Sequence, residues 1–461
     1  MTSWATTVLP FSGARVTVMG LGLFGGGVGV TRYLARRGAQ VTVTDLRNEA
    51  QLAESIESLK DVPVAFHLGE HVEEDFCDAD YVVVNPAVPE SSPWLAKAKL
   101  LESELNLFLK LCPSKRVVGI TGSNGKTTTT SLAGEMIRRA GESVYVGGNI
   151  GGSLLDSVDQ MTPEDVIVLE LSSFQLDQMR ALKKSPSVAA LLNLTPNHLD
   201  RHGSMENYVA AKKQIFSFQS EGDWKILNED DEAVMAMSNV SSSSSLVFSL
   251  KSGVRSGARI EGESIRVVHE KGSWVVDASG RRIPGLFNLQ NMAAAAAISF
   301  AVTGGGDLWR RAVEEVCQTF PGVPHRLEFV GEKEGIRYYN DSIATSPEST
   351  MVALETLPGP IVLLVGGYDK NLPMNMVADV IVKKVRVLVT YGRTGPRIAD
   401  LVEGRGPTVI REEGFEGALR CARENASTGD TVLLSPACAS YDLFRNFAER
   451  GDQFRSWVSG L

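Results

Sequence analysis

The chain has 461 residues, 43% of them hydrophobic and 22% charged, a composition typical of a globular enzyme with about three domains. Its formal net charge of −9 argues against nucleic acid or an anionic membrane surface as the main partner. No run approaches the roughly 18 apolar residues of a spanning helix, and the first residues lack a secretory signal. Five cysteines without a CxxC pair fit a reducing compartment. We therefore expect a cytoplasmic protein that binds neither nucleic acid nor membrane.

The first informative segment is a glycine-rich turn, GLGLFG, which carries Gly20, Gly22 and Gly25 after the strand-like run RVTVM. Asp45 ends the next strand-like run, at about the distance where an acidic residue binds ribose in dinucleotide-binding domains. Asn85 ends a third run, at the carboxyl edge where such sheets bind ligands. The motif alone is weak, because glycines also allow a merely structural turn. A second nucleotide loop further along favours a nucleotide-linked substrate here.

That second loop is RVVGITGSNGKTTTT, residues 116–130, an apolar run that breaks into glycines, a lysine and hydroxyls. Gly122 and Gly125 let backbone N–H groups face anionic oxygens, and Lys126 supplies a positive charge to the β- and γ-phosphates of ATP or GTP. Thr127 opens a predicted helix to about Ala140, with its hydroxyl placed to bind Mg²⁺. The glycine spacing differs from the usual G-x-x-x-x-G-K-[ST], so the loop is a variant.

Carboxylate, imidazole and amine groups follow the next strand-like runs. Glu170 ends the run over 166–169, where a carboxylate could hold the Mg²⁺ that bridges phosphates. His198 follows the run VAALLNL and comes to the same sheet edge, although a lone histidine is more often structural. Lys212 lies in a predicted helix, YVAAKKQIF, and the local pattern alone favours a solvated amine.

The alternation of apolar runs and helical segments predicts parallel α/β sheets in three domains. Linkers are expected around 111–114 and 320–324, which gives domains of residues 1–112, 113–322 and 323–461. A more polar, strand-like region to about Gly285 is expected as an excursion of the middle domain. The first and third domains are expected to be Rossmann-like, and the second a P-loop-type ATPase.

Several longer segments resemble the Mur ligase family of peptidoglycan synthesis. They include TGSNGKTTTT, GGNIGGS, ELSSFQL, NLTPNHLDRHGSMENYVAAKKQIF, FNLQNMAAAAA, YYNDSIATSPEST, GGYDK and LLSPACASYDLFRNFAERGDQF. ELSSFQL and the last segment resemble the branch that adds D-glutamate to UDP-N-acetylmuramoyl-L-alanine. The resemblance implies a UDP-binding domain, a central ATPase and a C-terminal domain that closes over the amino acid. It also implies ATP-driven amide formation through an acyl phosphate and two Mg²⁺ sites. We expect a monomer.

The resemblance assigns roles residue by residue. Catalysis falls to Lys126, His198, Lys212 and Asp341. ATP binding falls to Gly122, Ser123, Asn124, Gly125, Lys126, Thr127, Thr128, Asn288, Asn291 and Arg326. The residues expected to bind the UDP substrate are Gly22, Leu23, Phe24, Asp45, Leu46, Arg47, Asn85, Asn149, Ser172 and His198. The residues expected to bind the acceptor amino acid are Lys370, Ser440, Tyr441 and Phe447. The expected ligands of the metal ions are Thr127, Glu170, His198 and a carbamylated Lys212.

One position departs from the family pattern. Ligases for D-glutamate often carry DSKAT, whose lysine binds an acceptor carboxylate, whereas this chain has Ile343 within DSIAT. An apolar side chain cannot pair with that charge, and the loss of one partly exposed ion pair costs about 1 kcal/mol. We expect a weaker or rearranged acceptor pocket.

Two other classes of function stay open on the sequence. A related amide ligase with another acceptor, including a folate polyglutamate ligase, would share the nucleotide loop. A nucleotide-regulated binding or redox protein would use GLGLFG for NAD, would show no ATP turnover, and would leave Lys126 and Glu170 unexplained.

Overall fold

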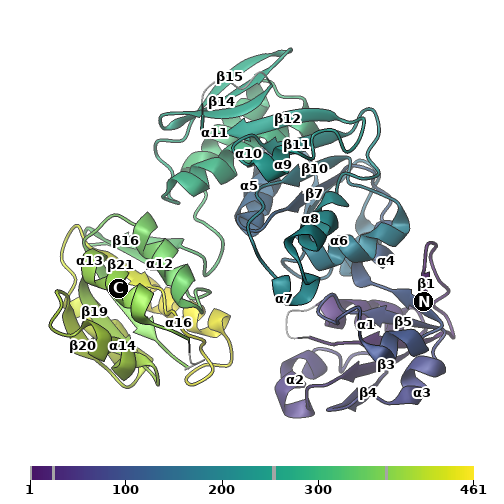
Figure 1. The fold of residues 1–461 in the computed structure, drawn as a ribbon, viewed down its shortest axis with the longest axis horizontal. Helices are drawn as coiled ribbons and strands as arrows, with labels where there is room; N and C mark the ends of the chain where they lie inside the picture. The colour runs from purple at the N-terminus through teal and green to yellow at the C-terminus, as the bar shows by residue number, and fades with distance from the viewer. Residues whose placement is uncertain (1–2, 23–25, 252–255, 369–371) are drawn as a thin grey trace. The chain divides into compact units, whose positions relative to one another are not determined.

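The computed structural model describes residues 3–22, 26–251, 256–368 and 372–461, and helices alternate with strands along most of it (Figure 1). The strands form three sheets, of six, nine and six strands, which confirms the expected α/β class. The chain packs into two compact units, Met1–Ala278 with Gln290–Val316 and Ser279–Leu289 with Cys317–Leu461. The first unit holds the first two sheets and the second unit the third. The expected domain boundaries after residues 112 and 322 stay a prediction.

The N-terminal sheet has the strand order β1-β6-β5-β2-β3-β4, and all of its strands are parallel. The strands are β1 Ser3–Trp4, β2 Arg15–Met19, β3 Gln40–Asp45, β4 Val64–Leu68, β5 Tyr81–Val84 and β6 Leu100–Glu102; the helices are α1 Gly26–Arg36, α2 Glu49–Glu57, α3 Glu73–Cys77, η1 Pro93–Lys97 and α4 Glu104–Leu111. The β-branched residues of β2 and β3 suit a buried parallel sheet. Because β3, β2 and β5 are neighbours, Asp45, Gly20 and Asn85 come to one edge.

The central sheet has the order β15-β14-β13-β12-β11-β10-β7-β9-β8. Its strands are β7 Val117–Thr121, β8 Val144–Gly148, β9 Val166–Glu170, β10 Val188–Leu191, β11 Trp224–Asn228, β12 Ser244–Ser249, β13 Gly257–Glu261, β14 Ser264–His269 and β15 Gly272–Asp277. Its helical segments are α5 Lys126–Arg139, η2 Leu154–Asp156, η3 Val158–Gln160, α6 Ser173–Met179, η4 Arg180–Leu182, α7 Leu199–His202, α8 Met205–Lys213, α9 Glu232–Met235, α10 Leu286–Thr303 and α11 Asp307–Thr319. β14 and β15 extend the parallel part in antiparallel fashion, which accounts for the polar strand-like region. The parallel register pairs Ile120 with Glu170 and Thr121 with Leu191, so the nucleotide loop, Glu170 and the segment before His198 leave the sheet side by side.

Within the described part of the chain, α10 is the helix with the length and hydropathy to cross a membrane. Its five alanines, from Ala293 to Ala297, are fully buried, and 67% of the apolar window is buried. Such a helix is ordinary in a protein core, so it is weak support for a membrane span.

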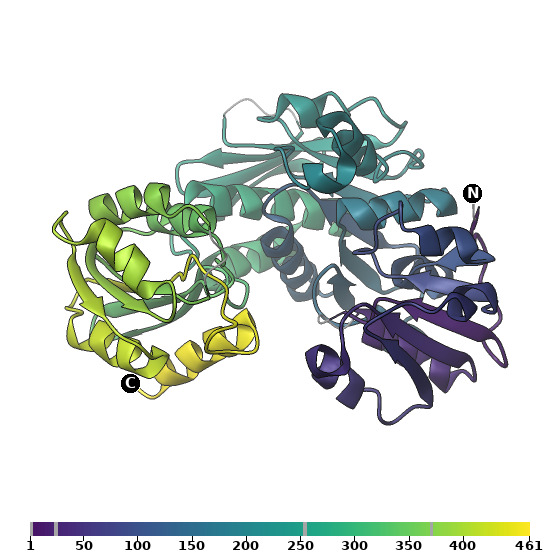
Figure 2. The same cartoon turned by 60° about the horizontal axis from the view of Figure 1, so that its bottom comes forward.

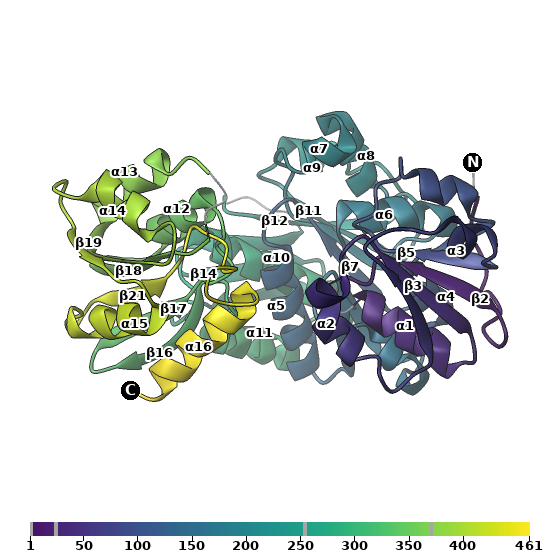
Figure 3. The same cartoon turned by 90° about the horizontal axis from the view of Figure 1, so that it is seen from below.

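The C-terminal unit contains a six-stranded sheet in the order β16-β17-β21-β18-β19-β20, in which β16 is antiparallel. Its strands are β16 Glu328–Lys333, β17 Ile336–Asn340, β18 Ile361–Gly366, β19 Val385–Tyr391, β20 Thr408–Arg411 and β21 Thr431–Leu434; its helices are α12 Pro347–Thr356, α13 Asn375–Lys384, α14 Gly395–Val402, α15 Phe415–Glu424 and α16 Phe447–Ser459. Figure 3 shows α12, α13 and α14 on one face of the sheet and α15 and α16 on the other. One apolar cluster joins the sheet to the first three helices, and another joins it to the last two. The chain ends in α16, drawn in yellow in Figure 2.

Candidate functional site

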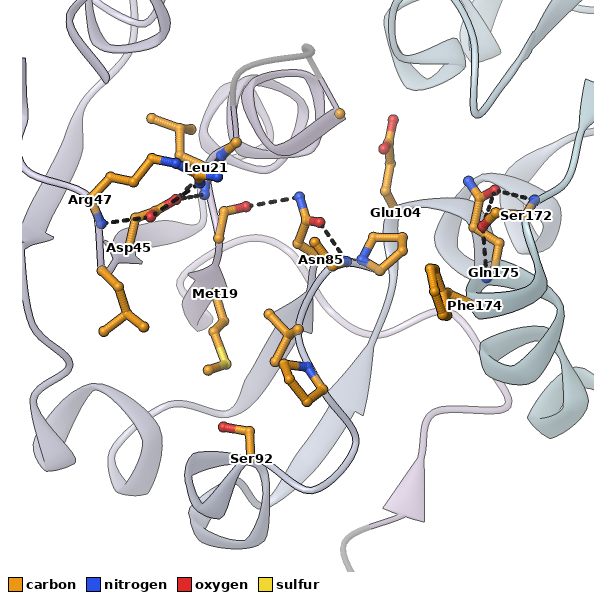
Figure 4. A pocket seen from close by; sticks show the side chains of 18 of the residues that line it. Met19, Leu21, Asp45, Arg47, Asn85, Ser92, Glu104, Ser172, Phe174 and Gln175 are labelled. Carbon is orange, nitrogen blue, oxygen red and sulfur yellow. Dashed lines mark hydrogen bonds and ion pairs between the residues drawn. The ribbon is translucent and has the colours of Figure 1, made fainter. Parts of the chain in front are cut away.

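A cavity of about 1100 Å³ opens in the first unit, between the N-terminal sheet and loops of the central sheet. Figure 4 shows Asp45 and Arg47 on one side, Ser172 and Phe174 on the other, and Glu104 between them. The predicted substrate residues that line it are Gly22, Asp45, Leu46, Arg47, Asn85, Asn149 and Ser172. Leu23 and Phe24 lie outside the described residues. The structure therefore brings together predicted residues that are up to 150 positions apart in the chain.

The carboxylate of Asp45 organises the glycine turn at one end of this cavity. Its Oδ2 accepts hydrogen bonds from the backbone N–H groups of Leu21 (3.0 Å) and Gly22 (3.3 Å), and its Oδ1 accepts one from Arg47 N–H (2.9 Å). Gly20 has φ +91°, and a Cβ there would lie 2.9 Å from Asn85 Cβ, so this position requires glycine. Because three N–H groups already occupy Asp45, its first role is to fix the turn.

The cavity also includes side chains that the sequence reasoning missed, among them His71, Trp94, Glu104, Phe174 and Arg201. Burial raises the pKa of the Glu104 carboxyl to about 7, against the opposing effect of the Ser153 hydroxyl. The HLDRH segment after a strand was the available signal for Arg201, since it sits three positions past His198.

The nucleotide loop has the shape expected of an anion-binding turn. Lys126 Nζ donates to the carbonyl oxygens of Gly122 (3.0 Å) and Ser123 (2.9 Å), which holds the ammonium over the loop. Gly125 has φ +81°, and a Cβ there would lie 2.5 Å from Asn291 Oδ1. α5 begins at Lys126, so its free N–H groups open onto the loop, and Thr127 is half-buried in its first turn.

Side chains from the β10 end brace this loop. Asn193 Oδ1 accepts a hydrogen bond from Asn124 N–H (2.8 Å), and Ser123 Oγ donates to the carbonyl of Thr195 (2.8 Å). Asn291 on α10 lies on the other side, where Thr129 Oγ1 donates to its Oδ1 (3.3 Å). The predicted ATP residues of the first unit therefore surround a single loop.

Lys212 is fully buried, with 1% of its surface exposed, so the local expectation of a solvated amine is wrong. Its Nζ donates to Thr121 Oγ1 at 2.9 Å, and that hydroxyl donates in turn to the Leu171 carbonyl at 2.6 Å. Burial, with the nearby charge of Lys126, lowers the pKa of the Lys212 amine to about 7. At neutral pH part of this amine is therefore uncharged and able to act as a nucleophile.

Glu170 is the carboxylate of this cluster and is 2% exposed. Its Oε1 accepts a hydrogen bond from Asn149 Nδ2 (2.9 Å), whereas its buried Oε2 has no hydrogen-bond partner among the described residues. A buried carboxylate oxygen left without a donor suits a cation. No group of three or more His, Cys, Asp and Glu side chains gathers in the described ranges, so an ion here needs further oxygen ligands, such as phosphate, water or a modified Lys212.

His198 is exposed and does not belong to the residues that line the cavity. It has φ +52°, which is uncommon for a residue with a side chain. Its ring centre lies 5.2 Å from that of Phe174, which does line the cavity.

In the C-terminal unit, Asp341 follows β17 and is 5% exposed. Its Oδ2 accepts a hydrogen bond from Ser435 Oγ (2.8 Å) and its Oδ1 one from Leu327 N–H (3.1 Å). Burial raises the pKa of this carboxyl to about 7. Arg326 precedes Leu327 in the sequence and is exposed, and Asn288, also in this unit, donates from Nδ2 to the Pro284 carbonyl (2.7 Å).

The predicted acceptor residues lie after β21 in the same unit. Ser440 is buried, Tyr441 is 64% exposed, and Phe447 begins α16. Lys370 lies outside the described residues. Sequence reasoning missed Arg450, a fully buried arginine that donates to Ser342 Oγ (2.9 Å) and to the Ser342 carbonyl (2.8 Å). These bonds hold the segment that continues into half-buried Ile343.

Comparison with known families assigns all three sheets to one kind of enzyme. Residues 14–105 match the Mur ligase MurD-like N-terminal domain, residues 120–299 the Mur ligase middle domain, and residues 325–438 the glutamate ligase domain of Mur ligases. The chain belongs to the Mur ligase family. This confirms the resemblance noted in the sequence.

Relatives of this Mur ligase match it from end to end. It is 42% identical to a UDP-N-acetylmuramoylalanine–D-glutamate ligase of Symbiobacterium thermophilum, over 97% of this chain and 98% of the relative. It is 40% identical to the protein of the same name from Roseiflexus, over 98% of this chain and 100% of the relative.

Solved structures support the fold of the Mur ligase. UDP-N-acetylmuramate-alanine ligase MurC of Thermotoga maritima aligns with a TM-score of 0.61 at 19% identity, over 97% of this chain and 99% of that chain. MurF of Acinetobacter baumannii aligns with a TM-score of 0.60 at 14% identity, over 97% of this chain and 94% of that chain.

Proposed function

We propose that this Mur ligase is an ADP-forming amide ligase that joins D-glutamate to UDP-N-acetylmuramoyl-L-alanine. The observation that carries the proposal is identity of about 40% along the whole chain to relatives named for that reaction. The cavity of the first unit supports it, because it is lined at one end by the glycine turn and at the other by Asn149 and Ser172. An elongated nucleotide-sugar-peptide suits such a cavity.

The reaction needs ATP because a carboxylate oxygen is a poor leaving group. The alanine carboxylate attacks the γ-phosphorus of ATP, forms an acyl phosphate and releases ADP. The amine of D-glutamate then attacks the acyl carbon, expels inorganic phosphate and loses a proton. Negative charge develops on the phosphoryl oxygens, where Lys126 and the loop N–H groups stabilise it. We propose that ATP is bound by Gly122, Ser123, Asn124, Gly125, Lys126, Thr127, Thr128, Asn288, Asn291 and Arg326.

The nucleotide substrate is proposed to lie along the cavity with its uridine near Asp45, Leu46 and Arg47. Backbone N–H groups around Gly22 and the side chain of Asn85 are proposed for the diphosphate. Leu23 and Phe24 are proposed for the same end. Asn149, Ser172 and His198 are proposed to orient the sugar and its peptide.

Mg²⁺ is proposed to be held by Thr127, Glu170, His198 and Lys212, and when bound it neutralises phosphate charge. The unpartnered Glu170 Oε2 supports a cation here. The uncharged fraction of Lys212 can add through nitrogen to the carbon of CO2 and lose a proton, which converts the amine into an anionic carbamate. Its pKa of about 7 favours that step at neutral pH.

The acceptor is proposed to bind in the C-terminal unit, against Lys370, Ser440, Tyr441 and Phe447, with Asp341 placed for the phosphates. We also propose that the protein is a cytoplasmic monomer with two Mg²⁺ sites and with domains of residues 1–112, 113–322 and 323–461.

The test is phosphate release from ATP by the purified full chain with Mg²⁺ and UDP-N-acetylmuramoyl-L-alanine. D-Glutamate, L-glutamate, L-alanine, meso-diaminopimelate and L-lysine are added in separate reactions. We expect release with D-glutamate alone, and no release from the Lys126→Met variant. Release with another amino acid would assign a different acceptor, and no release with any would refute the ligase.

A further inference from the structure

Arg201 joins the two sides of the cavity. It lies in α7, after the β10 strand of the central sheet, yet its guanidinium reaches the segment that follows β5 of the N-terminal sheet. Nη1 donates to the Ala87 carbonyl (2.8 Å), and Nη2 donates to the carbonyls of Pro86 (3.3 Å) and Val88 (3.2 Å). Arg201 and these three residues all line the cavity. One side chain therefore ties the segment of Pro86, Ala87 and Val88 to the loop that carries His198.

The same guanidinium packs on an aromatic cluster. Its central carbon lies 4.2 Å from the ring centre of Phe174, a distance typical of a cation–π contact. The Phe174 ring is stacked on His202, with centres 5.2 Å apart and planes 10° apart, and meets His198 at 5.2 Å and 61°. The Phe174 ring thus contacts Arg201, His198 and His202.

Backbone contacts extend this link to His198. The His198 carbonyl accepts hydrogen bonds from the N–H groups of Arg201 (3.0 Å) and His202 (3.0 Å), which close the turn of α7. His198 itself has φ +52°, a strained value that persists only where the surroundings hold it. A four-residue helix supplies little stability of its own, so the turn depends on its anchors, which are Arg201 on the N-terminal side of the cavity and the bond between His202 Nε2 and Ser173 Oγ (2.9 Å).

We infer that Arg201 is a positioning residue for the nucleotide-linked substrate. It holds the Pro86–Val88 wall and the His198 turn at the separation that the sugar-peptide requires, and the inference rests on the proposed function. Three carbonyl acceptors in a row match the two terminal nitrogens of a planar guanidinium, whereas a lysine offers a single nitrogen without that fork. Arg201 is not among the residues proposed to bind ATP or the acceptor.

The experiment measures KM for each of the three substrates, together with kcat, in Arg201→Met and Arg201→Lys. Methionine keeps part of the apolar stem and removes every donor. Arg180→Met is the matched control, because Arg180 is 58% exposed, pairs with Asp177 on α6 and does not line the cavity. Equilibrium binding of UDP and of UDP-N-acetylmuramoyl-L-alanine without ATP is measured in parallel.

We expect Arg201→Met to raise KM for UDP-N-acetylmuramoyl-L-alanine by about tenfold, and to leave KM for ATP and D-glutamate within about twofold. Arg201→Lys recovers less than half of the loss. UDP alone binds both variants nearly as it binds the original protein, because the uridine end is built by other residues. Arg180→Met behaves as the original protein in every measurement.

Two results would overturn the inference. One is an unchanged KM for the nucleotide substrate in Arg201→Met. The other is an equal rise in all three KM values with a lower unfolding temperature, which would mark a merely structural residue. An original protein without D-glutamate-dependent phosphate release would instead refute the proposed function, so the two failures are distinguishable.

Discussion

Replacing Lys212 with methionine should make the protein more stable at pH 7 while it abolishes activity. The pKa of this amine is about 7 in the folded protein and 10.5 in the unfolded chain. Because the folded value is the lower one, the folded state releases the proton first. The penalty for burying the charge is complete below pH 7 and disappears as the pH rises to 10.5. At pH 7 this linkage lowers the free energy of unfolding by on the order of 4 kcal/mol.

Part of this gain is offset in the variant. Thr121 Oγ1 loses the hydrogen bond that Lys212 Nζ donates, although its own hydroxyl keeps the Leu171 carbonyl as acceptor; the attraction to Glu170 is already contained in the folded pKa. We therefore expect a net stabilisation of about 2 kcal/mol at pH 7, and close to none at pH 9.5.

The assay is urea unfolding of the original protein and of Lys212→Met at pH 7 and pH 9.5, in buffers free of CO2 so that no carbamate replaces the cation. Lys225→Met is the matched control. Lys225 is equally buried, but its Nζ donates to the carbonyls of Ser241 (2.8 Å) and Ser243 (2.9 Å), which the variant would leave without this donor. We expect it to be destabilised by about 1 to 3 kcal/mol at both pH values. A Lys212→Met variant that is less stable at pH 7, or whose gain does not depend on pH, would refute the reasoning.

Two further substitutions test the nucleotide loop and the acceptor pocket. Gly125→Ala should raise KM for ATP by about tenfold, because the new Cβ would lie 2.5 Å from Asn291 Oδ1. Gly203→Ala controls for backbone strain, because Gly203 has a similar φ and no atom lies within 4 Å of its new Cβ. Equal effects of the two substitutions on KM would exclude the Asn291 contact as the cause. Ile343→Lys should lower KM for D-glutamate by adding a partner for its carboxylate, and steady-state kinetics that show an unchanged or higher KM would contradict this.

Much of the fold and of the cavity could be predicted because parallel strands impose their order on the residues that follow them. Gly122, Glu170 and His198 each come after a strand of apolar residues, and β7, β9 and β10 are neighbours in the sheet. The same logic placed Asp45 and Asn85 at one edge. The order of the strands does not predict which partners each side chain binds. Asp45, for example, accepts hydrogen bonds from the N–H groups of its own turn, and the ribose contact expected for it stays a prediction.

Burial and long-range contacts could not be predicted from local patterns. Lys212 and Lys213 are adjacent in a helix, and nothing in YVAAKKQIF says that the first is buried and the second exposed. Arg201 and Arg450 meet carbonyl groups that are more than 100 positions away in the chain. Such contacts depend on which loops the folded sheets bring together.

Lys212, Asp341 and Glu170 are ionisable groups buried in the protein, and their burial ties stability to function. Lys212 and Asp341 are held at a pKa of about 7, one lowered and the other raised by burial, while Glu170 keeps an oxygen without a hydrogen-bond donor. Each arrangement destabilises the protein when no ligand is bound, and apolar residues of similar size would pack there at lower cost. A cation beside Glu170 and a carbamate on Lys212 would each remove part of that cost. If the proposed ligands bind there, binding would stabilise the fold, and the stability gained by Lys212→Met measures the cost at Lys212 when they are absent.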